Sequence, residues 1–200
     1  MLTSTPNLLT LGRVAMIPIV VALLYVEERW GRWAACLVFT IAATTDWVDG
    51  HLARKWQQQS LFGRWLDPIA DKLLVGATLT MLVGFGRAPL LPSVVIMLRE
   101  IMVSGLREYM AEVRVGMPVT RLAKWKTAVQ MTAIGFLIVG EAGPSWLAVT
   151  WVGWVGLWVA AVLTLVTGWE YLQAGLAHML AADQVPAAAA ETKHVHHASL

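Results

Sequence analysis

The chain has 200 residues, of which 58% are hydrophobic and only 14% are charged, and its mean hydropathy is +0.62. Soluble domains are usually close to half apolar and a quarter charged, so this composition indicates a membrane protein with one bundle of spans. The net charge of +2 does not suggest nucleic-acid binding and fits anionic lipid headgroups or phosphate substrates better. Because Cys36 is the only cysteine, no disulfide can form within the chain.

Six stretches are apolar enough to cross a bilayer as helices, which takes about 20 residues each. They are approximately Leu8–Val26, Trp33–Ala53, Trp65–Phe85, Leu91–Met110, Lys126–Val139 and Leu147–Ala177. The fifth stretch is short and is expected to extend somewhat beyond these residues, and the sixth is long. The first lacks the basic start and the cleavage site of a secretory signal, so we expect it to be a span. The predicted fold class is all-α, a polytopic membrane protein with six transmembrane helices in residues 1–180. A disordered, Ala-rich tail is expected over residues 181–200.

Basic residues are distributed unevenly between the predicted loops. One side carries seven, Arg54, Lys55, Arg64, Arg114, Arg121, Lys124 and Lys126, and the other carries three, Arg29, Arg32 and Arg87. Since an excess of Lys and Arg marks the cytoplasmic side, both termini are expected in the cytoplasm. The same rule places the segment between the second and third spans at the cytoplasmic face of the cell membrane.

That segment, residues 46–72, carries four aspartates in an otherwise apolar region. Asp46 and Asp49 are three residues apart, and Asp67 and Asp71 are four apart, so on helices each pair shares one face. Consecutive spans joined by a short loop are antiparallel neighbours, which allows the four carboxylates to converge. Ionisable groups at membrane depth are unfavourable and usually functional. A divalent cation would relieve their repulsion, and an all-oxygen ligand set suits Mg²⁺ or Mn²⁺.

Small residues accompany the aspartates. Gly50, Ala53 and Gly63 lie on the same faces and would let a phosphorylated ligand approach the backbone, while Arg54 adds a fixed positive charge. Together these residues outline a diphosphate site. The alternative is a contact between small residues of two helices, with the aspartates buried as a polar relay.

The combined pattern is D-x2-D-G-x2-A-R-x8-G-x3-D-x3-D, met by Asp46, Asp49, Gly50, Ala53, Arg54, Gly63, Asp67 and Asp71. It is identified as the signature of the CDP-alcohol phosphotransferase family. The stretches "PNLLTLGRV", "DPIADKLL" and "REIMVSGLREYMAE" resemble the branch of that family that makes phosphatidylglycerophosphate. The resemblance implies six transmembrane helices, a homodimer, and transfer of a phosphatidyl group from CDP-diacylglycerol to sn-glycerol 3-phosphate with release of CMP.

The resemblance also implies roles for individual residues. The metal ligands, for a pair of Mg²⁺ or Mn²⁺ ions, fall on Asp46, Asp49, Asp67 and Asp71, and the last is also the expected general base. The CDP-binding residues fall on Gly50, Ala53, Arg54 and Gly63, with Asn7, Thr10 and Arg13 of the first span nearby.

The chemistry itself favours the same base. A hydroxyl that attacks phosphorus must lose its proton, and a carboxylate within hydrogen-bond reach can accept it. Asp71 is predicted to lie deepest in the apolar bundle, where a carboxylate is most basic. Asp67 stays open as an alternative.

A phosphate-bearing acceptor needs cations of its own. The candidates for binding glycerol 3-phosphate are Lys72, Arg99, Arg107, Lys124 and Lys126. Arg99 and Arg107 are eight residues apart, about two helical turns, and are expected to share one face of the fourth span. Alternatively, Glu100 and Glu108 pair with these arginines, and Lys124 and Lys126 only mark the cytoplasmic side.

Three other interpretations remain open at this stage. A sister enzyme would use another acceptor, such as inositol phosphate, serine or phosphatidylglycerol, and the basic set on the fourth and fifth spans argues for a phosphorylated one. A cation or proton transporter would also place aspartates in the membrane, but the six spans lack paired inverted halves. A structural lipid-binding protein would not need four carboxylates at this spacing.

Overall fold

The computed structural model describes the backbone of residues 5–56, 61–113, 115–116 and 120–197, and the side chains of residues 10–45, 66, 69–113, 115–116 and 120–177. Within these ranges all regular structure is helical. The α-helices are α1 (Thr5–Leu24), α2 (Arg29–Trp56), α3 (Leu61–Gly84), α4 (Leu90–Glu112), α5 (Arg121–Val139) and α6 (Val149–His197), with 3₁₀ turns η1 (Gly140–Ala142) and η2 (Ser145–Leu147) before α6. The all-α prediction is confirmed, and each predicted span falls on one helix.

Glycine, proline and threonine set several helix ends. Gly86 follows α3 with φ of 67°, and Gly140 ends α5 with φ of 48°; both values favour glycine because it has no Cβ. Pro89 is the N-cap of α4, and the hydroxyl of Thr120 caps α5 by accepting from the Ala123 backbone N–H at 3.3 Å. The Gly- and Pro-rich stretches "GFGRAPLLP" and "GEAGPS" therefore coincide with the turns between α3 and α4 and between α5 and α6.

The helices are longer than the apolar stretches that revealed them. α5 begins at Arg121, five residues before the predicted start, because its first turns are basic rather than apolar. α6 continues to His197, whereas the sequence predicted no regular structure after residue 180. Alanine has the strongest helix propensity, so an Ala-rich segment can extend a helix without any apolar face. The division of the chain at residue 180 stays a prediction.

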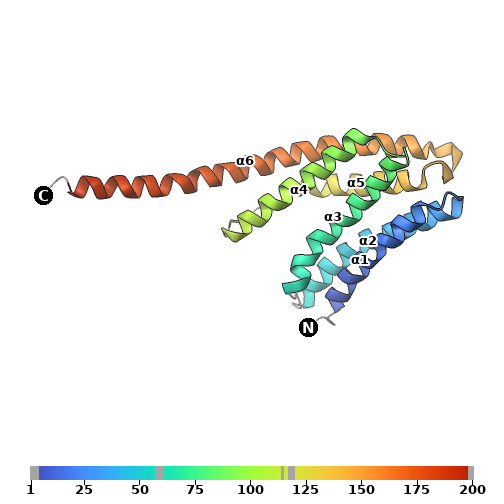
Figure 1. Ribbon diagram of the computed structural model, residues 1–200, viewed down its shortest axis with the longest axis horizontal. Helices are drawn as coiled ribbons and strands as arrows, with labels where there is room; N and C mark the ends of the chain where they lie inside the picture. The colour runs from blue at the N-terminus through green and yellow to red at the C-terminus, as the bar shows by residue number, and fades with distance from the viewer. Residues whose placement is uncertain (1–4, 57–60, 114, 117–119, 198–200) are drawn as a thin grey trace.

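The six helices form two groups that pack together. α1 lies against α2 and α3, while α6 lies against α4 and α5, and the contact of α2 with α5 joins the groups. Figure 1 shows the start of α1, the end of α2 and the start of α3 at the same end of the bundle. α2 and α3 are antiparallel and in contact, as the short segment between them predicts.

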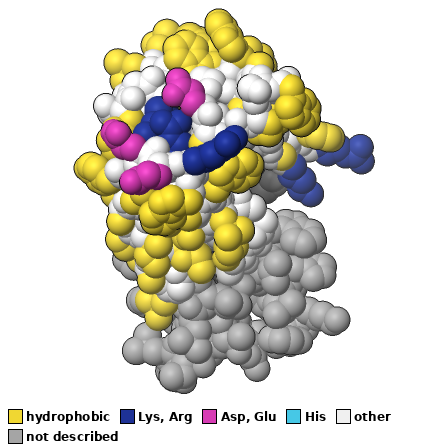
Figure 2. Space-filling view, turned by 90° about the vertical axis from the view of Figure 1, so that its right-hand side faces the viewer, with side chains coloured by type: hydrophobic (Ala, Val, Ile, Leu, Met, Phe, Trp, Pro, Cys, Tyr) yellow, Lys and Arg dark blue, Asp and Glu magenta, His cyan; other side chains and the backbone are white. Residues whose placement is uncertain are grey.

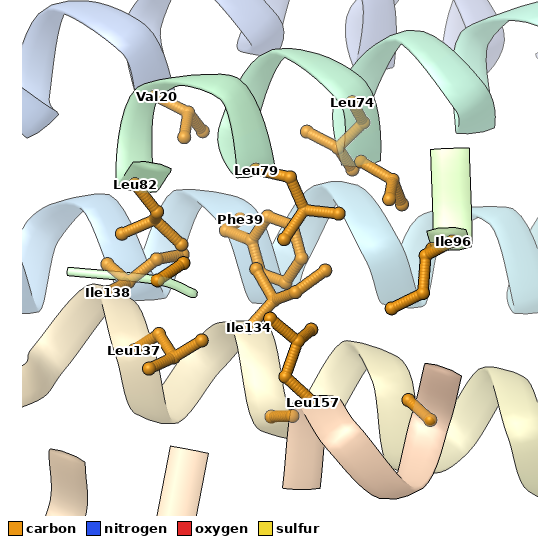
Figure 3. Packing of buried hydrophobic residues seen from close by; sticks show 14 of the residues in the cluster. Val20, Phe39, Leu74, Leu79, Leu82, Ile96, Ile134, Leu137, Ile138 and Leu157 are labelled. Carbon is orange, nitrogen blue, oxygen red and sulfur yellow. The ribbon is translucent and has the colours of Figure 1, made fainter. Parts of the chain in front are cut away.

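The core lies where the two groups meet. Phe39 of α2 and Leu79 of α3 face Ile134 of α5 and Leu157 of α6, and Figure 3 shows them packed together. All four side chains are almost completely buried. Burying a large apolar side chain contributes about 1.5–3 kcal/mol, so this cluster holds α2 and α3 against α5 and α6.

The outer surface is also apolar. Leu37, Leu98, Ile101, Trp151 and Trp169 are each more than half exposed. Soluble monomers rarely expose contiguous apolar areas of this kind. Within the described residues, Ser145–Ala177 is the one helical segment long and apolar enough to cross a membrane by length and composition, and Thr10–Leu24 is a shorter apolar helix.

The end of the bundle opposite the aspartate-rich segment is tied by side chains that donate to turn carbonyls. Arg29 Nε and Trp33 Nε1 donate to the Ala142 carbonyl oxygen at 2.8 and 3.2 Å. Trp154 Nε1 donates to the Arg87 carbonyl oxygen at 3.1 Å. Viewed from this end, Figure 2 shows acidic and basic side chains gathered in one patch among hydrophobic ones. These contacts join the start of α2 to the turn between α5 and α6, and the turn between α3 and α4 to α6. We call them the end tie.

Candidate active site

The aspartate motif spans the end of α2 and the first half of α3. The helical backbone places Asp46 and Asp49 on one face of α2, and Asp67 and Asp71 on one face of α3. Several predicted site residues have side chains outside the described ones: Asn7, Asp46, Asp49, Gly50, Ala53, Arg54, Gly63 and Asp67. Asp71 is therefore the one motif aspartate whose contacts the structure describes.

Asp71 forms an ion pair with α1. Arg13 Nη1 donates to Asp71 Oδ1 at 2.8 Å, although the two residues are 58 positions apart in the chain. The Arg13 side chain is completely buried, while that of Asp71 is 39% exposed. A buried guanidinium needs a counter-charge, so this pair fixes α1 against α3 at the level of the motif. Asp71 is therefore not deeply buried, in contrast to the position predicted from the sequence.

The next residue, Lys72, points toward α4. Its ammonium group donates to the hydroxyl of Ser104. One turn earlier in α4, Glu100 accepts from the ammonium group of Lys126 on α5. Because Glu100 and Ser104 are four residues apart, they share one face of α4. Two of the predicted acceptor-binding lysines thus reach the same face of α4 from opposite sides.

Arg99 is directed to α6 instead. Its Nε donates to the Thr164 carbonyl oxygen at 3.1 Å, and its Nη2 donates to the hydroxyl of Thr167 at 2.8 Å. Only 7% of Arg99 is exposed. Its guanidinium carbon also lies 5.7 Å from the ring centre of Tyr171, within cation–π range.

These contacts form three groups that together make a polar layer in an otherwise apolar bundle. We define the polar layer as Arg13, Asp71, Lys72, Arg99, Glu100, Ser104, Lys126, Thr164 and Thr167. It connects α1, α3, α4, α5 and α6. Among the side chains described, no three His, Cys, Asp or Glu residues come together as metal ligands. Three of the four predicted metal ligands, Asp46, Asp49 and Asp67, have side chains outside the described ones.

The remaining predicted cations lie at the surface. Arg107 and Lys124 are exposed, and Arg99 and Arg107 do not share a face of α4. The physical reason is helical geometry: at 3.6 residues per turn, eight residues turn the helix by about 80° beyond two full turns. Arg107 is instead one turn from Ser104. Thr10, which was predicted to lie near the CDP moiety, is buried on α1 one turn before Arg13.

Three hydroxyl residues of the polar layer were missed from the sequence: Ser104, Thr164 and Thr167. A signal for the two threonines was present, since Thr164, Thr167 and Tyr171 follow one another at helical spacing in an otherwise apolar helix. Ser104 offered no comparable pattern. Glu100, which the sequence offers as an alternative partner of Arg99, accepts from both Arg99 and Lys126.

The ion pair of Arg13 gives a first expected result. Arg13→Met should lower the stability of the protein, because Asp71 then loses a charge-assisted hydrogen bond worth about 1.5–3 kcal/mol. The measurement is the thermal unfolding midpoint in detergent. Arg13→Lys retains the charge and should lose less. Equal midpoints for wild type and Arg13→Met would mean that the pair does not stabilise the bundle.

Known proteins resemble this chain over most of its length. The sequence model of the CDP-alcohol phosphatidyltransferase family matches residues 3–166. A protein of Rickettsia typhi is 44% identical over 84% of this chain and 95% of its own length, and one of Shigella flexneri serotype 5b is 42% identical over 88% and 96%. A protein of Cereibacter sphaeroides is 37% identical over 88% and 97%.

All three relatives bear the name CDP-diacylglycerol–glycerol-3-phosphate 3-phosphatidyltransferase. The family match includes both halves of the aspartate motif and all residues of the polar layer except Thr167. The matched region, the motif spacing and the identity to these relatives agree, and the chain belongs to the CDP-alcohol phosphatidyltransferase family.

Proposed function

We propose that this protein transfers the phosphatidyl group of CDP-diacylglycerol to sn-glycerol 3-phosphate, giving phosphatidylglycerophosphate and CMP. The observation that carries the proposal is the polar layer, in which Lys72, the residue that follows Asp71, and Lys126 reach one face of α4. A reacting carboxylate beside clustered cations suits an acceptor that carries both a hydroxyl and a phosphate. The names of the relatives, at 37–44% identity, point to the same reaction.

The protein is proposed to be embedded in the cell membrane by six spans, with the motif at the cytoplasmic face. The exposed apolar side chains support contact with lipid, because water would otherwise cover them. Both basic loops fall at the motif end, as the positive-inside rule requires for a cytoplasmic site. This position gives access to a water-soluble acceptor from the cytoplasm and to a lipid donor from the bilayer. The homodimer implied by the family is part of the proposal.

A divalent cation, Mg²⁺ or Mn²⁺, is proposed between α2 and α3. The backbone fits such a site, since each helix offers two aspartates on one face and the two helices are antiparallel neighbours. Asp46, Asp49, Asp67 and Asp71 would hold a pair of ions. When bound, they would neutralise the diphosphate oxygens and stabilise the departing CMP.

The residues of the chain supply the other steps. Gly50, Ala53 and Gly63 are proposed to let the CDP moiety approach the helix backbones, with Arg54, Asn7 and Thr10 as its polar contacts. Asp71 is proposed to accept the proton of the attacking hydroxyl. Arg13, which was predicted to contact CDP, donates to Asp71 and so orients this carboxylate.

The acceptor phosphate is proposed to bind between α3, α4 and α5. Lys72 and Lys126 border this region, and Arg107 lies one turn from Ser104 at its open end. Lys124, two residues before Lys126, can attract the acceptor from solvent. The guanidinium of Arg99 donates two hydrogen bonds to α6, so Arg99 is not proposed to contact the phosphate directly, in contrast to the prediction from the sequence.

An acceptor screen tests the proposed function. Purified protein receives CDP-diacylglycerol, a divalent ion and one candidate alcohol, and CMP release is measured. We expect release with sn-glycerol 3-phosphate and little with serine, phosphatidylglycerol or inositol phosphate. Release with one of the other alcohols alone would identify a sister enzyme, and release with none would contradict the proposal.

Arg107 gives a more specific expectation. Arg107→Ala should raise the KM for glycerol 3-phosphate by about 10- to 100-fold, the effect of losing a charge-assisted phosphate contact. The KM for CDP-diacylglycerol should change much less. Arg121→Ala removes another exposed arginine from the same end of the bundle and serves as the control. Equal increases in both KM values would show that Arg107 does not bind the acceptor.

A further inference from the structure

Arg99 and Glu100 lie beside the proposed acceptor region but do not face it as free charges. Arg99 is buried, and two of its nitrogens donate to α6. A guanidinium has a planar, fixed fork of donors, so two such bonds determine its orientation. The Arg99 side chain therefore belongs to the contact between α4 and α6.

Gly168 makes room for this contact. A Cβ atom at residue 168 would lie 3.0 Å from Arg99 Cγ and 3.3 Å from Arg99 Nε. The hydrogen bonds to Thr164 and Thr167 restrain Arg99, so its stem cannot move away without weakening them. The absence of a side chain at Gly168 thus allows α6 to approach α4 at the level of Arg99.

Glu100 continues the chain of contacts toward α5. Its Oε1 lies 3.5 Å from Arg99 Nη1 and also accepts from the Lys126 ammonium group. The Lys126 side chain is only 6% exposed. A buried ammonium without a counter-charge is strongly unfavourable, so Glu100 determines where Lys126 can place its charge. Thus α6 contacts Arg99, Arg99 contacts Glu100, and Glu100 contacts Lys126.

We propose that Arg99 and Glu100 are positioning residues that hold Lys126 in place for the phosphate of the acceptor. The inference rests on the proposed function, because it assigns Lys126 to the acceptor site. It adds that α6, which carries none of the motif aspartates, influences acceptor affinity through Gly168 and Arg99. A phosphate group then meets an ammonium that is already oriented, which reduces the ordering required on binding.

The test measures CMP release by the full-length protein while glycerol 3-phosphate and CDP-diacylglycerol are varied in turn. Glu100→Gln keeps the shape of the side chain but removes its charge. It should raise the KM for glycerol 3-phosphate by about 10-fold or more, with the KM for the donor changed by less than about 2-fold. A residue that only stabilised the fold would not produce this split.

A double-mutant cycle then separates direct from indirect action. If Glu100 acts through Lys126, the variant carrying both Glu100→Gln and Lys126→Met should have the same acceptor KM as Lys126→Met alone. If the fold-changes in acceptor KM of the two single variants multiply in the double variant, Glu100 contacts the acceptor itself. An unchanged or lowered acceptor KM in Glu100→Gln would also overturn the inference.

Gly168→Ala tests the contribution of α6, and it also tests the inference if Glu100→Gln does not fold. Like Glu100→Gln, it should raise the KM for glycerol 3-phosphate. Gly175→Ala is the matched control, because its Cβ would meet Leu106, an apolar side chain, at 2.7 Å. Equal acceptor KM values in these two variants would contradict the role of Gly168. A wild-type protein inactive with glycerol 3-phosphate would contradict the proposed function itself.

Discussion

Asp46→Asn, Asp49→Asn and Asp67→Asn should each abolish CMP release. An amide oxygen is a much weaker ligand than a carboxylate for a hard cation such as Mg²⁺. Removing a residue that hydrogen-bonds to a metal ligand typically lowers metal affinity or activity by about 10- to 100-fold. Removing a ligand itself should lower them further. The measurement is CMP release at saturating donor and acceptor over a range of Mg²⁺ or Mn²⁺ concentrations.

The wild-type protein should also lose its activity in a strong chelator and regain it when Mg²⁺ or Mn²⁺ is restored. Asp183→Asn is the matched control, since Asp183 is the fifth and last aspartate of the chain and lies outside the motif. Unimpaired CMP release in the chelator would contradict the proposed metal site.

Asp71→Asn is expected to reduce the rate by about 10²- to 10⁴-fold, the usual effect of removing a general base. Donor binding should persist, because three aspartates remain to hold an ion against the diphosphate. The amide has nearly the same shape as the carboxylate, so the packing of α3 against α1 should change little. Arg13 can still donate to the amide oxygen, although this bond is weaker than one to a carboxylate.

Donor affinity separates the two possible roles of Asp71. It is measured with the metal present, for Asp71→Asn and Asp46→Asn side by side. Asp46→Asn should weaken donor binding as well as the rate. If Asp71→Asn weakens donor binding to the same extent, Asp71 acts mainly as a ligand. Asp67 or the phosphate of the acceptor would then have to accept the proton.

Local features of the sequence predicted the helices and the motif. Each apolar stretch contains its own signal, and the turns at Gly86 and Gly140 follow from residues in or next to them. The positions of Asp46 and Asp49 on one face of α2 follow from their spacing alone. Such predictions depend on neighbours in sequence. The structure confirms the helices, while the side chains of Asp46 and Asp49 lie outside the described ones.

Contacts between distant residues could not be predicted in the same way. The pairing of Arg13 with Asp71 spans 58 positions, and that of Arg99 with Thr164 spans 65. A list of basic residues cannot distinguish a cation that binds phosphate from one that fixes two helices together. Arg99 and Arg107 looked equivalent in the sequence, but one is buried against α6 and the other is exposed.

The end tie has a mechanical consequence. Arg29, the first residue of α2, is anchored to the Ala142 carbonyl, so α2 behaves as a lever with its pivot at that end. α2 has 28 residues, and Asp46 and Asp49 lie in its second half, 17 and 20 residues after Arg29. At about 1.5 Å per residue, Asp49 lies about 30 Å from the pivot, and a tilt of about 5° would move it by about 3 Å. A small rotation at the tied end would thus change the distance between the aspartates of α2 and those of α3, and the end tie restrains this rotation.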